Sequence, residues 1–292
     1  MDTANLFKFL YNNKNRDHKT LIMGILNVTP DSFFDGGVHF EKNGAVEHGL
    51  EMVRQGADII DIGGESTRPF SGPISLDEEL RRVMPVLEKL SGKIKVPISI
   101  DTYKSEVARQ AIEAGATIVN DISALSFDPA MGSLIAETNV SVILMHMKGT
   151  PKNMQSNPTY EDLIGDIKSF FHHRLEMAIQ TGIKRDHMII DPGIGFGKSY
   201  NDNLRIIKEL HKFSDLGQPI LIGTSNKSFI GAILGPSLES RDNGTMATVA
   251  AAIMNGANIV RVHNVKAAKE TATMIDAIKS GHTRQLKNQI KK

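Results

Sequence analysis

Side chains that can carry charge or form hydrogen bonds stand at the end of every short apolar run in this chain. In chain order they are Asn27, Asp61, Asp101, Asn120 with Asp121, His146, Asp191, Thr224 and Ser225 with Lys227, and Arg261 with His263. One such residue is often only a cap for the helix that follows. Eight successive cases, several with long functional side chains, predict a polar cavity lined from all sides.

Arg261 and His263 indicate what such a cavity could bind. Residues two apart on a strand point to the same side of it, so these two side chains would act together. A guanidinium offers a fixed bidentate fork to an anion, and the imidazole adds a second donor. The pair is therefore a candidate site for an anion, and internal ion pairs are the alternative.

The apolar runs have the length and composition of buried β-strands. They are hydrophobic almost throughout rather than alternating, as strands covered on both faces should be. They cover residues 21–27, 58–62, 96–101, 117–121, 140–146, 188–191, 219–223 and 259–263. Helical patterns lie between them, at 44–55, 76–90, 104–114, 129–138, 161–181, 203–213, 245–255 and 266–280. Several of these helices are followed by a glycine suited to end them, among them Gly56, Gly115, Gly182 and Gly256.

Eight strand–helix units at fairly even spacing predict a single-domain (β/α)₈ TIM barrel, with a doubly wound open sheet as the alternative. In such a barrel the carboxyl ends of the strands form the active site. We expect the barrel to span residues 21–283, after an N-terminal extension over 1–20 and before a basic C-terminal tail over 284–292.

Composition argues against several classes of function. With 34 basic and 33 acidic residues the net charge is +1, so no overall field favours nucleic acid or a membrane surface. The chain has no cysteine, which rules out disulfides, thiolate metal sites and cysteine nucleophiles. It also lacks the apolar core of a signal peptide and any apolar run long enough to span a bilayer. We therefore expect a soluble protein that is not exported.

Two long polar loops follow the first two apolar runs. Their sequences are NVTPDSFFDGGVHF and GGESTRPFSGP, and both exceed a minimal turn between a strand and a helix. They lie on the face that carries the polar residues, so they are candidate lids over the cavity. Ordinary surface irregularity is the alternative.

These segments together resemble dihydropteroate synthase, a family of folate biosynthesis. The matching stretches are MGILNVTPDSFFDGG (23–37), DIGGESTRP (61–69), SIDT (99–102), ND (120–121), MHMKG (145–149), DPGIGFGK (191–198), SNKS (225–228) and RVH (261–263). They occur in the family's order and span most of the barrel. The resemblance implies a cytoplasmic, mostly dimeric transferase that joins 6-hydroxymethyl-7,8-dihydropterin pyrophosphate to p-aminobenzoate, releasing pyrophosphate.

The resemblance also implies a pterin site. Asp101, Asn120 and Asp191 would read the donor and acceptor edge of the ring, and Lys227 would contact it. Met145 would pack against the flat ring. Asp101, Asp191 and Lys227 are the implied catalytic residues. Considered singly, Asp191 and Asn120 could instead cap turns, and a lone methionine is more often part of a core.

The two remaining parts of the implied site hold the leaving group and the second substrate. Arg261 and His263 would bind the pyrophosphate, with Asn27 as a ligand of Mg²⁺. The p-aminobenzoate pocket would be formed by Thr67, Arg68, Pro69, Phe196 and Ser228, with Lys227 beside them. Free backbone N–H groups at the start of the helix after Lys227 suit a carboxylate. Phe196 in a glycine-rich loop could equally be a hydrophobic plug.

The expected mechanism needs no strong enzymatic base. The bond to pyrophosphate breaks first, and Asp101 and Asp191 stabilise the cation left on the pterin methylene. The aromatic amine is unprotonated at neutral pH and needs only positioning. Sulfonamides resemble p-aminobenzoate, so we expect them to inhibit. The only other expected partners are small-molecule substrates and a second copy of the chain in a homodimer.

Three positions depart from the family pattern. Asn226 stands where an arginine is common, Asn264 where an aspartate is common, and Phe70 where a glycine is frequent. The first removes a positive charge near the anionic substrates. Two other functions are therefore considered: a pterin-binding protein without turnover, and a methyltetrahydrofolate-dependent methyltransferase. The latter has no pyrophosphate to bind, so Arg261, His263 and the STRP loop argue against it.

Overall fold

The computed structural model describes residues 19–29, 38–66, 72–156, 158–235 and 237–282, without the side chains of 38–43 and 238–240. The expected basic tail, and the expected N-terminal extension up to residue 18, lie outside these ranges. So do Thr67, Arg68, Pro69 and Phe70. Among the helices in the described ranges, none is long and apolar enough to cross a bilayer.

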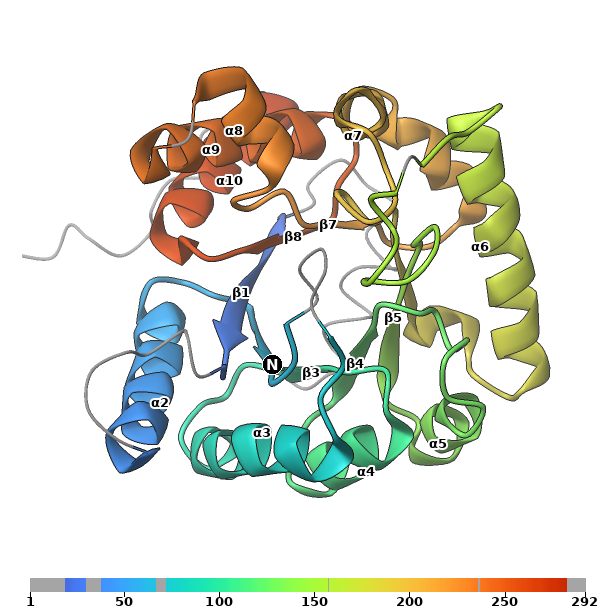
Figure 1. The fold of residues 1–292 in the computed structure, drawn as a ribbon. Coiled ribbons are helices and arrows are strands. Elements are labelled where there is room, and N and C mark those ends of the chain that lie inside the picture. The colour runs from blue at the N-terminus through green and yellow to red at the C-terminus, as the bar shows by residue number, and fades with distance from the viewer. Residues whose placement is uncertain (1–18, 30–37, 67–71, 157, 236, 283–292) are drawn as a thin grey trace, which may run out of the picture.

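Eight parallel strands form the centre of the molecule (Figure 1). They are β1 (Leu21–Asn27), β2 (Ile59–Gly63), β3 (Ile98–Asp101), β4 (Ile118–Asp121), β5 (Ser141–Met145), β6 (Met188–Asp191), β7 (Leu221–Ile222) and β8 (Ile259–Val262). Their order is β6-β5-β4-β3-β2-β1-β8-β7, and a parallel bridge between Ile190 and Ile220 joins the two ends. The sheet is therefore a nearly closed barrel. This confirms the predicted TIM barrel and excludes the doubly wound sheet.

Helices surround the barrel and follow the predicted pattern with three differences (Figure 1). They are α2 (Val38–Arg54), α3 (Leu76–Ser91), α4 (Ser105–Glu113), α5 (Met131–Thr138), α6 (Leu163–Gln180), α7 (Tyr200–Lys208), α8 (Ser228–Leu234), α9 (Leu238–Met254) and α10 (Val265–Ser280). Helices α2 and α9 begin earlier than expected, the predicted helix at 203–213 divides into α7 and a 3₁₀ segment at Leu210–Leu216, and α8 was not predicted. Helix α8 has only seven residues, too few for a clear helical periodicity.

The glycines expected to end four helices do so. Gly56, Gly115, Gly182 and Gly256 have φ angles of 101°, 110°, 102° and 107°, in the region that side chains with a Cβ rarely adopt. Each returns the chain from a helix to the next strand. These four helices therefore end where the sequence pattern predicted.

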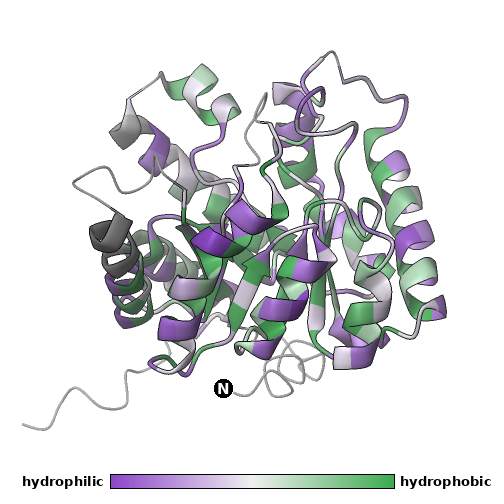
Figure 2. Cartoon of the chain, turned by 60° about the horizontal axis from the view of Figure 1, so that its bottom comes forward, coloured by the Kyte–Doolittle hydropathy of each residue, from purple (hydrophilic) through white to green (hydrophobic). Residues whose placement is uncertain are grey.

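Successive side chains on a strand point to opposite faces, so one set of strand residues points into the barrel and the other points toward the helices. One set of buried residues fills the lower barrel interior: Leu21, Met23, Ile59, Ile118, Ile143, Ile189, Leu221 and Ile259. Outward-facing residues such as Ile22, Ile60 and Val260 pack in the core that also includes the helices. Hydrophobic residues gather along the strands and inner helix faces, with hydrophilic ones outside (Figure 2). Two residues beyond the apolar layer, the inward positions become Asp61, Asn120, Met145, Asp191 and Arg261.

Candidate active site

Arg261 forms the centre of a charged cluster at the carboxyl end of the barrel. Its Nε donates to Asp61 Oδ2 and its Nη2 to Asp101 Oδ2, both at 2.6 Å. Asn120 Nδ2 also donates to Asp61 Oδ2, at 3.1 Å. These four side chains come from β8, β2, β3 and β4. The structure thus brings these four strand ends together as the sequence predicted, and Arg261 makes the ion pairs considered as its alternative.

One guanidinium in this cluster faces two carboxylates. Burial raises the pKa of Asp101, and the charge of Asp61 adds to this while Arg261 opposes it. Burial alone would lower the pKa of Arg261, but Asp61 and Asp101 outweigh it and the pKa lies above its usual value. Asp61 is fully buried, and its Oδ1 finds no hydrogen-bond partner among the described residues. The described residues therefore leave one buried acceptor of this cluster unsatisfied.

Asp191 and Lys227 lie close enough to Arg261 and to each other for their charges to interact. Asp191 ends β6, and its Oδ1 accepts a hydrogen bond from the backbone N–H of Gly193 at 2.8 Å. Burial raises the pKa of Asp191, against the charges of Lys227 and Arg261. Burial and the repulsion of Arg261 lower the pKa of Lys227 to about 8, with Asp191 and Asp101 opposing. Lys227 is therefore a cation whose charge is lost close to neutral pH.

An apolar patch adjoins these charges. Its buried members are Ile122, Met145, Met154 and Phe196, and Tyr103 and Met147 pack against it. The Nζ of Lys227 lies 4.2 Å from the centroid of the Phe196 ring, in a cation–π contact. Met145 and Phe196 therefore belong to this patch and not to the large core beneath the helices. A flat aromatic ligand could lie on the patch with its polar edge toward Asp191.

Other predicted residues stand at strand ends around the same mouth. Asn27 ends β1 and is partly exposed. His263 follows β8, and its Nδ1 lies 2.8 Å from Ser225 Oγ, which links the ends of β7 and β8. Ser228 is exposed and is the first residue of α8. The expected contribution of Thr67, Arg68 and Pro69 falls outside the described residues.

The structure gives a physical reason for one departure from the family pattern. The side-chain oxygen of Asn264 caps α10 by accepting from the Ala267 N–H at 3.1 Å, and its Nδ2 donates to Asp242 Oδ2 at 2.6 Å. An aspartate could cap the helix but would repel Asp242. Asn226 has a φ of 58°, a conformation that asparagine tolerates better than most residues.

Three residues of the site were not assigned a role from the sequence. Asp61 is the buried partner of Arg261, and an ionisable residue within the apolar strand IIDIG was a signal that a cation must face it. Met154 joins the apolar patch from the loop after β5. Lys198 is 1% exposed beside His146. No signal in the sequence distinguishes such a lysine from a surface one.

Gly193 offers a test of how tightly the loop after β6 is packed. Its φ is 70°, and a Cβ there would lie 2.0 Å from the backbone oxygen of His146. Gly193→Ala is therefore expected to lower the free energy of unfolding by about 3 kcal/mol, because backbone strain and a clash add. Gly217→Ala is the matched control, since Gly217 has the same φ and its Cβ would meet Arg185 Nη2 only at 3.4 Å.

The control is expected to lose only about 1 kcal/mol, the cost of the left-handed conformation. Urea unfolding of the two variants measures the difference. Equal losses would mean that the loop can move away from His146.

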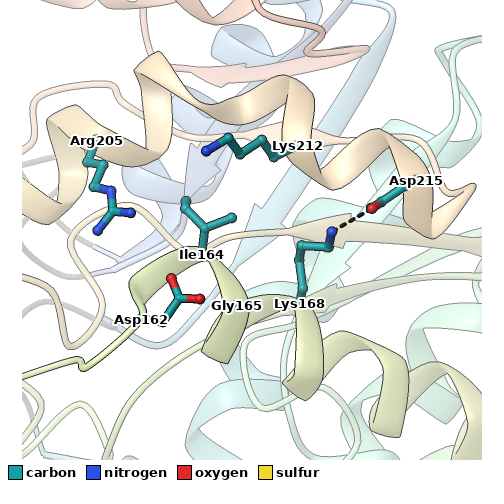
Figure 3. Close-up of a pocket in the computed structure, with 7 residues that line it drawn as sticks. All are labelled: Asp162, Ile164, Gly165, Lys168, Arg205, Lys212 and Asp215. Carbon is teal, nitrogen blue, oxygen red and sulfur yellow. Dashed lines mark hydrogen bonds and ion pairs between the residues drawn. The ribbon is translucent and has the colours of Figure 1, made fainter.

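A separate hollow lies outside the barrel mouth, with a volume of about 310 Å³. Asp162, Ile164, Gly165, Lys168, Arg205, Lys212 and Asp215 line it, from α6, α7 and the 3₁₀ segment after α7 (Figure 3). Its cations are already paired, Lys168 with Asp215 and both Arg205 and Lys212 with Glu209. It therefore offers little free charge to a ligand, and the candidate site remains the barrel mouth.

The chain matches the model of a protein family described as pterin binding enzyme over residues 23–263. It is 48% identical over 260 residues to the dihydropteroate synthase of Bacillus subtilis, which covers 89% of both chains.

Solved structures agree with this. A Clostridium difficile dihydropteroate synthase in the presence of pteroic acid has a TM-score of 0.84 at 47% identity, covering 89% of this chain and 97% of the other. A Xanthomonas albilineans dihydropteroate synthase with 4-aminobenzoic acid has a TM-score of 0.85 at 42% identity, covering 91% and 94%. A Yersinia pestis dihydropteroate synthase in a sulfonamide complex has a TM-score of 0.85 at 43% identity, covering 90% and 95%.

Proposed function

We propose that this chain, which belongs to the pterin-binding enzymes and among them to the dihydropteroate synthases, catalyses the transfer reaction of that family in folate biosynthesis. It condenses 6-hydroxymethyl-7,8-dihydropterin pyrophosphate with p-aminobenzoate and forms 7,8-dihydropteroate and pyrophosphate. The observation that carries the proposal is the arrangement at the barrel mouth. Carboxylates, an amide, two cations and an apolar patch there converge from seven strand ends and their loops.

The pterin is proposed to lie between Asp191, Asn120 and Lys227 with one face on Met145. Asp191 uses only one oxygen in the hydrogen bond to Gly193, which supports a second bond to donors on the ring edge. Asn120 is buried and donates to Asp61, and it is proposed to share the ring edge with Asp191. Asp101 contributes negative charge beside Arg261.

The pyrophosphate is proposed to bind Arg261 and His263. A guanidinium has five N–H groups, and Arg261 uses two of them for Asp61 and Asp101. The rest are available for the leaving group. Held by two carboxylates, the fork is fixed before substrate arrives, which is the arrangement that stabilises developing charge most effectively.

Mg²⁺ is proposed to bind together with the pyrophosphate. No group of three or more histidine, aspartate or glutamate residues in the described ranges could hold a metal on its own. A single amide ligand such as Asn27 fits an ion that keeps several waters and takes its other ligands from substrate phosphates. When bound, the ion would neutralise the departing oxygens.

The reaction proposed for these residues begins with loss of pyrophosphate from the pterin methylene. Asp101 and Asp191 lie where their negative charge can stabilise the cation that forms. The amine of p-aminobenzoate then attacks without an enzymatic base. Phe196 and Ser228 are proposed to position this substrate together with Thr67, Arg68 and Pro69. Sulfonamides, which resemble p-aminobenzoate, are expected to compete for the same position.

One assay tests the proposal. Purified chain with Mg²⁺ and the pterin pyrophosphate is expected to release pyrophosphate much faster when p-aminobenzoate is present, with formation of dihydropteroate in equal amount. Pterin binding without release would instead indicate a binding protein. A homodimer, a cytoplasmic location and a barrel domain spanning residues 21–283 remain predictions from the sequence.

The charge of Lys227 predicts a pH dependence. Its pKa is lowered to about 8, so the free enzyme loses this cation as the pH rises through that value. The kcat/KM for the pterin pyrophosphate, which reports free-enzyme groups, is then expected to fall about fivefold from about pH 8 to about pH 9. Lys227→Arg keeps the charge, and the remaining activity of this variant should lack that fall. A fall that persists in Lys227→Arg would assign it to another group.

Asn27 predicts a dependence on metal concentration. Asn27→Ala is expected to raise the Mg²⁺ concentration needed for half-maximal rate by about tenfold, because one of few protein ligands is lost. The KM for p-aminobenzoate should stay within about twofold, since the ion contacts only the other substrate. Steady-state rates across a Mg²⁺ titration measure both, and an unchanged titration curve would contradict the assignment.

A further inference from the structure

Lys198 is a buried lysine to which the proposed mechanism gives no role. It is 1% exposed and ends the stretch DPGIGFGK. Its Nζ lies 2.9 Å from His146 Nδ1, 3.0 Å from the backbone oxygen of Phe196 and 3.3 Å from that of His146. All three are neutral acceptors. Burying a lysine in this way is energetically costly, and these three hydrogen bonds offset part of the cost. We therefore ask which part of the structure the three bonds hold in place.

The loop at residues 193–198, which ends at Lys198, has glycine at every second position and therefore few side chains that could fix its conformation. Gly193, Gly195 and Gly197 all have positive φ angles. A Cβ at Gly193 would lie 2.0 Å from the backbone oxygen of His146, and one at Gly197 would lie 2.3 Å from that of Lys148. The loop therefore rests backbone to backbone on the segment after β5. Its position depends on hydrogen bonds from other elements.

Those bonds can be assigned group by group. Asn203 Oδ1 accepts from the Gly195 N–H at 2.7 Å, Gln155 Nε2 donates to the Gly195 oxygen at 2.7 Å, and the Tyr160 hydroxyl donates to the Gly197 oxygen at 2.8 Å. The Phe196 oxygen is held by Lys198. Lys198 is thus the link that ties the backbone of Phe196 to the end of β5.

The two segments that Lys198 joins both contribute to the apolar patch. The Phe196 ring lies under Lys227, and Met145 directly precedes His146. Phe196 and Met145 are neighbours in the same buried cluster. A shift of either backbone would change the wall on which the aromatic substrate rests.

His146 is suited to be a permanent acceptor in this link. Burial lowers its pKa to about 2, and the charge of Lys198 adds to that effect. The ring is therefore neutral, and its Nδ1 accepts a hydrogen bond from Lys198 Nζ while Nε2 carries the proton. The ring of Phe170 packs edge-on against it at a centroid distance of 4.8 Å.

We propose that Lys198 is a positioning residue that holds Phe196 against the end of β5 in the orientation that p-aminobenzoate requires. The inference rests on the proposed function. It assigns Lys198 no contact with substrate. Its effect should therefore appear in the binding of one substrate and in the mobility of one loop.

The first variant is Lys198→Met, which keeps the length of the side chain and removes its donors. The KM for p-aminobenzoate is expected to rise about tenfold or more, because small misplacements of a positioning group have large effects. The KM for the pterin pyrophosphate should change less than about threefold, since Asp191 is held by the sheet. Hydrogen exchange of the backbone amides in residues 193–198 should become faster. Tyr160→Phe is the matched control, because it removes one donor to the same loop at the carbonyl of Gly197 rather than that of Phe196, and it should leave both KM values unchanged.

A chemical rescue tests whether the effect of Lys198→Met comes from the lost amino group or from altered packing. The chain has no cysteine, so Lys198→Cys can be alkylated at that single site with 2-bromoethylamine in the unfolded chain and refolded. This restores an ammonium at the length of lysine, and the KM for p-aminobenzoate should return toward that of the unaltered chain treated in the same way. An unchanged KM in folded Lys198→Met, an equal rise in Tyr160→Phe, or no rescue would overturn the inference. If the unaltered chain shows no turnover, the proposed function fails, and unchanged amide exchange in Lys198→Met would then overturn the inference separately.

Discussion

Replacing Arg261 with methionine is expected to abolish turnover and to destabilise the barrel in one step. The guanidinium holds Asp61 and Asp101 at 2.6 Å each, and Asp61 is fully buried. Removing it leaves two carboxylates facing each other without a cation, which costs about 3–5 kcal/mol of folding free energy. The proposed pyrophosphate contact disappears at the same time, so kcat/KM should fall about 10³-fold or more.

The pH dependence of this loss follows from the charges. Burial already raises the pKa of Asp101, and without Arg261 the pKa of this carboxyl must rise further. A carboxyl with a raised folded pKa binds its proton more tightly in the native state, so stability is greatest at low pH and is lost as the pH rises toward that pKa. Urea unfolding of Arg261→Met should therefore show a larger free energy near pH 5 than near pH 8.

A second variant distinguishes the two roles of Arg261. Combining Arg261→Met with Asp61→Asn removes the most deeply buried of the unpaired charges and should recover part of the stability. Activity should not return, because the fork for pyrophosphate is still missing. If Arg261→Met alone has the stability of the unaltered chain at pH 8, the cluster is not the energetic centre that its geometry indicates.

The sequence was most informative about the strands and least informative about what their side chains contact. Each apolar run became a strand, because a parallel barrel buries both faces and leaves no polar alternation to obscure the pattern. The polar strand ends then met in one mouth because all eight carboxyl ends lie on the same side. The barrel predicted that β8 and β2 flank β1, but not that Arg261 would pair with Asp61, 200 residues away, because several polar strand ends lie near each cation.

Short and loop-dependent features were the ones missed. Helix α8 lacks the length for a periodic pattern, and the role of Asn264 depends on Asp242, which another helix brings near. Lys198 is buried only because three glycines allow two loops to approach each other backbone to backbone. A pattern of residue types does not reveal such an approach.

Asp191 and Asp121 provide the sharpest test of which buried carboxylates serve the ligand. Both end strands and both are buried, but their oxygens are used differently. Asp121 Oδ1 accepts from the N–H and the hydroxyl of Ser123 at 2.7 Å, and its Oδ2 accepts from the N–H of Leu125 at 2.8 Å. Asp191 accepts from the Gly193 N–H at Oδ1, and its second oxygen is the one proposed to bind the substrate.

The same substitution should therefore have opposite effects at the two positions. Asp191→Asn keeps the acceptor for Gly193 and removes a carboxylate whose pKa burial raises, so stability should change by less than about 1 kcal/mol. Activity should fall about 10³-fold or more, because an amide N–H then faces the ring donors that the carboxylate would accept. Asp121→Asn should lose about 1–3 kcal/mol of stability, since a buried N–H or hydroxyl is left without its acceptor, and should reduce kcat/KM by less than about tenfold. Urea unfolding and steady-state kinetics on the pair measure both effects. A large activity loss at Asp121 with little at Asp191 would place the pterin on β4 rather than β6.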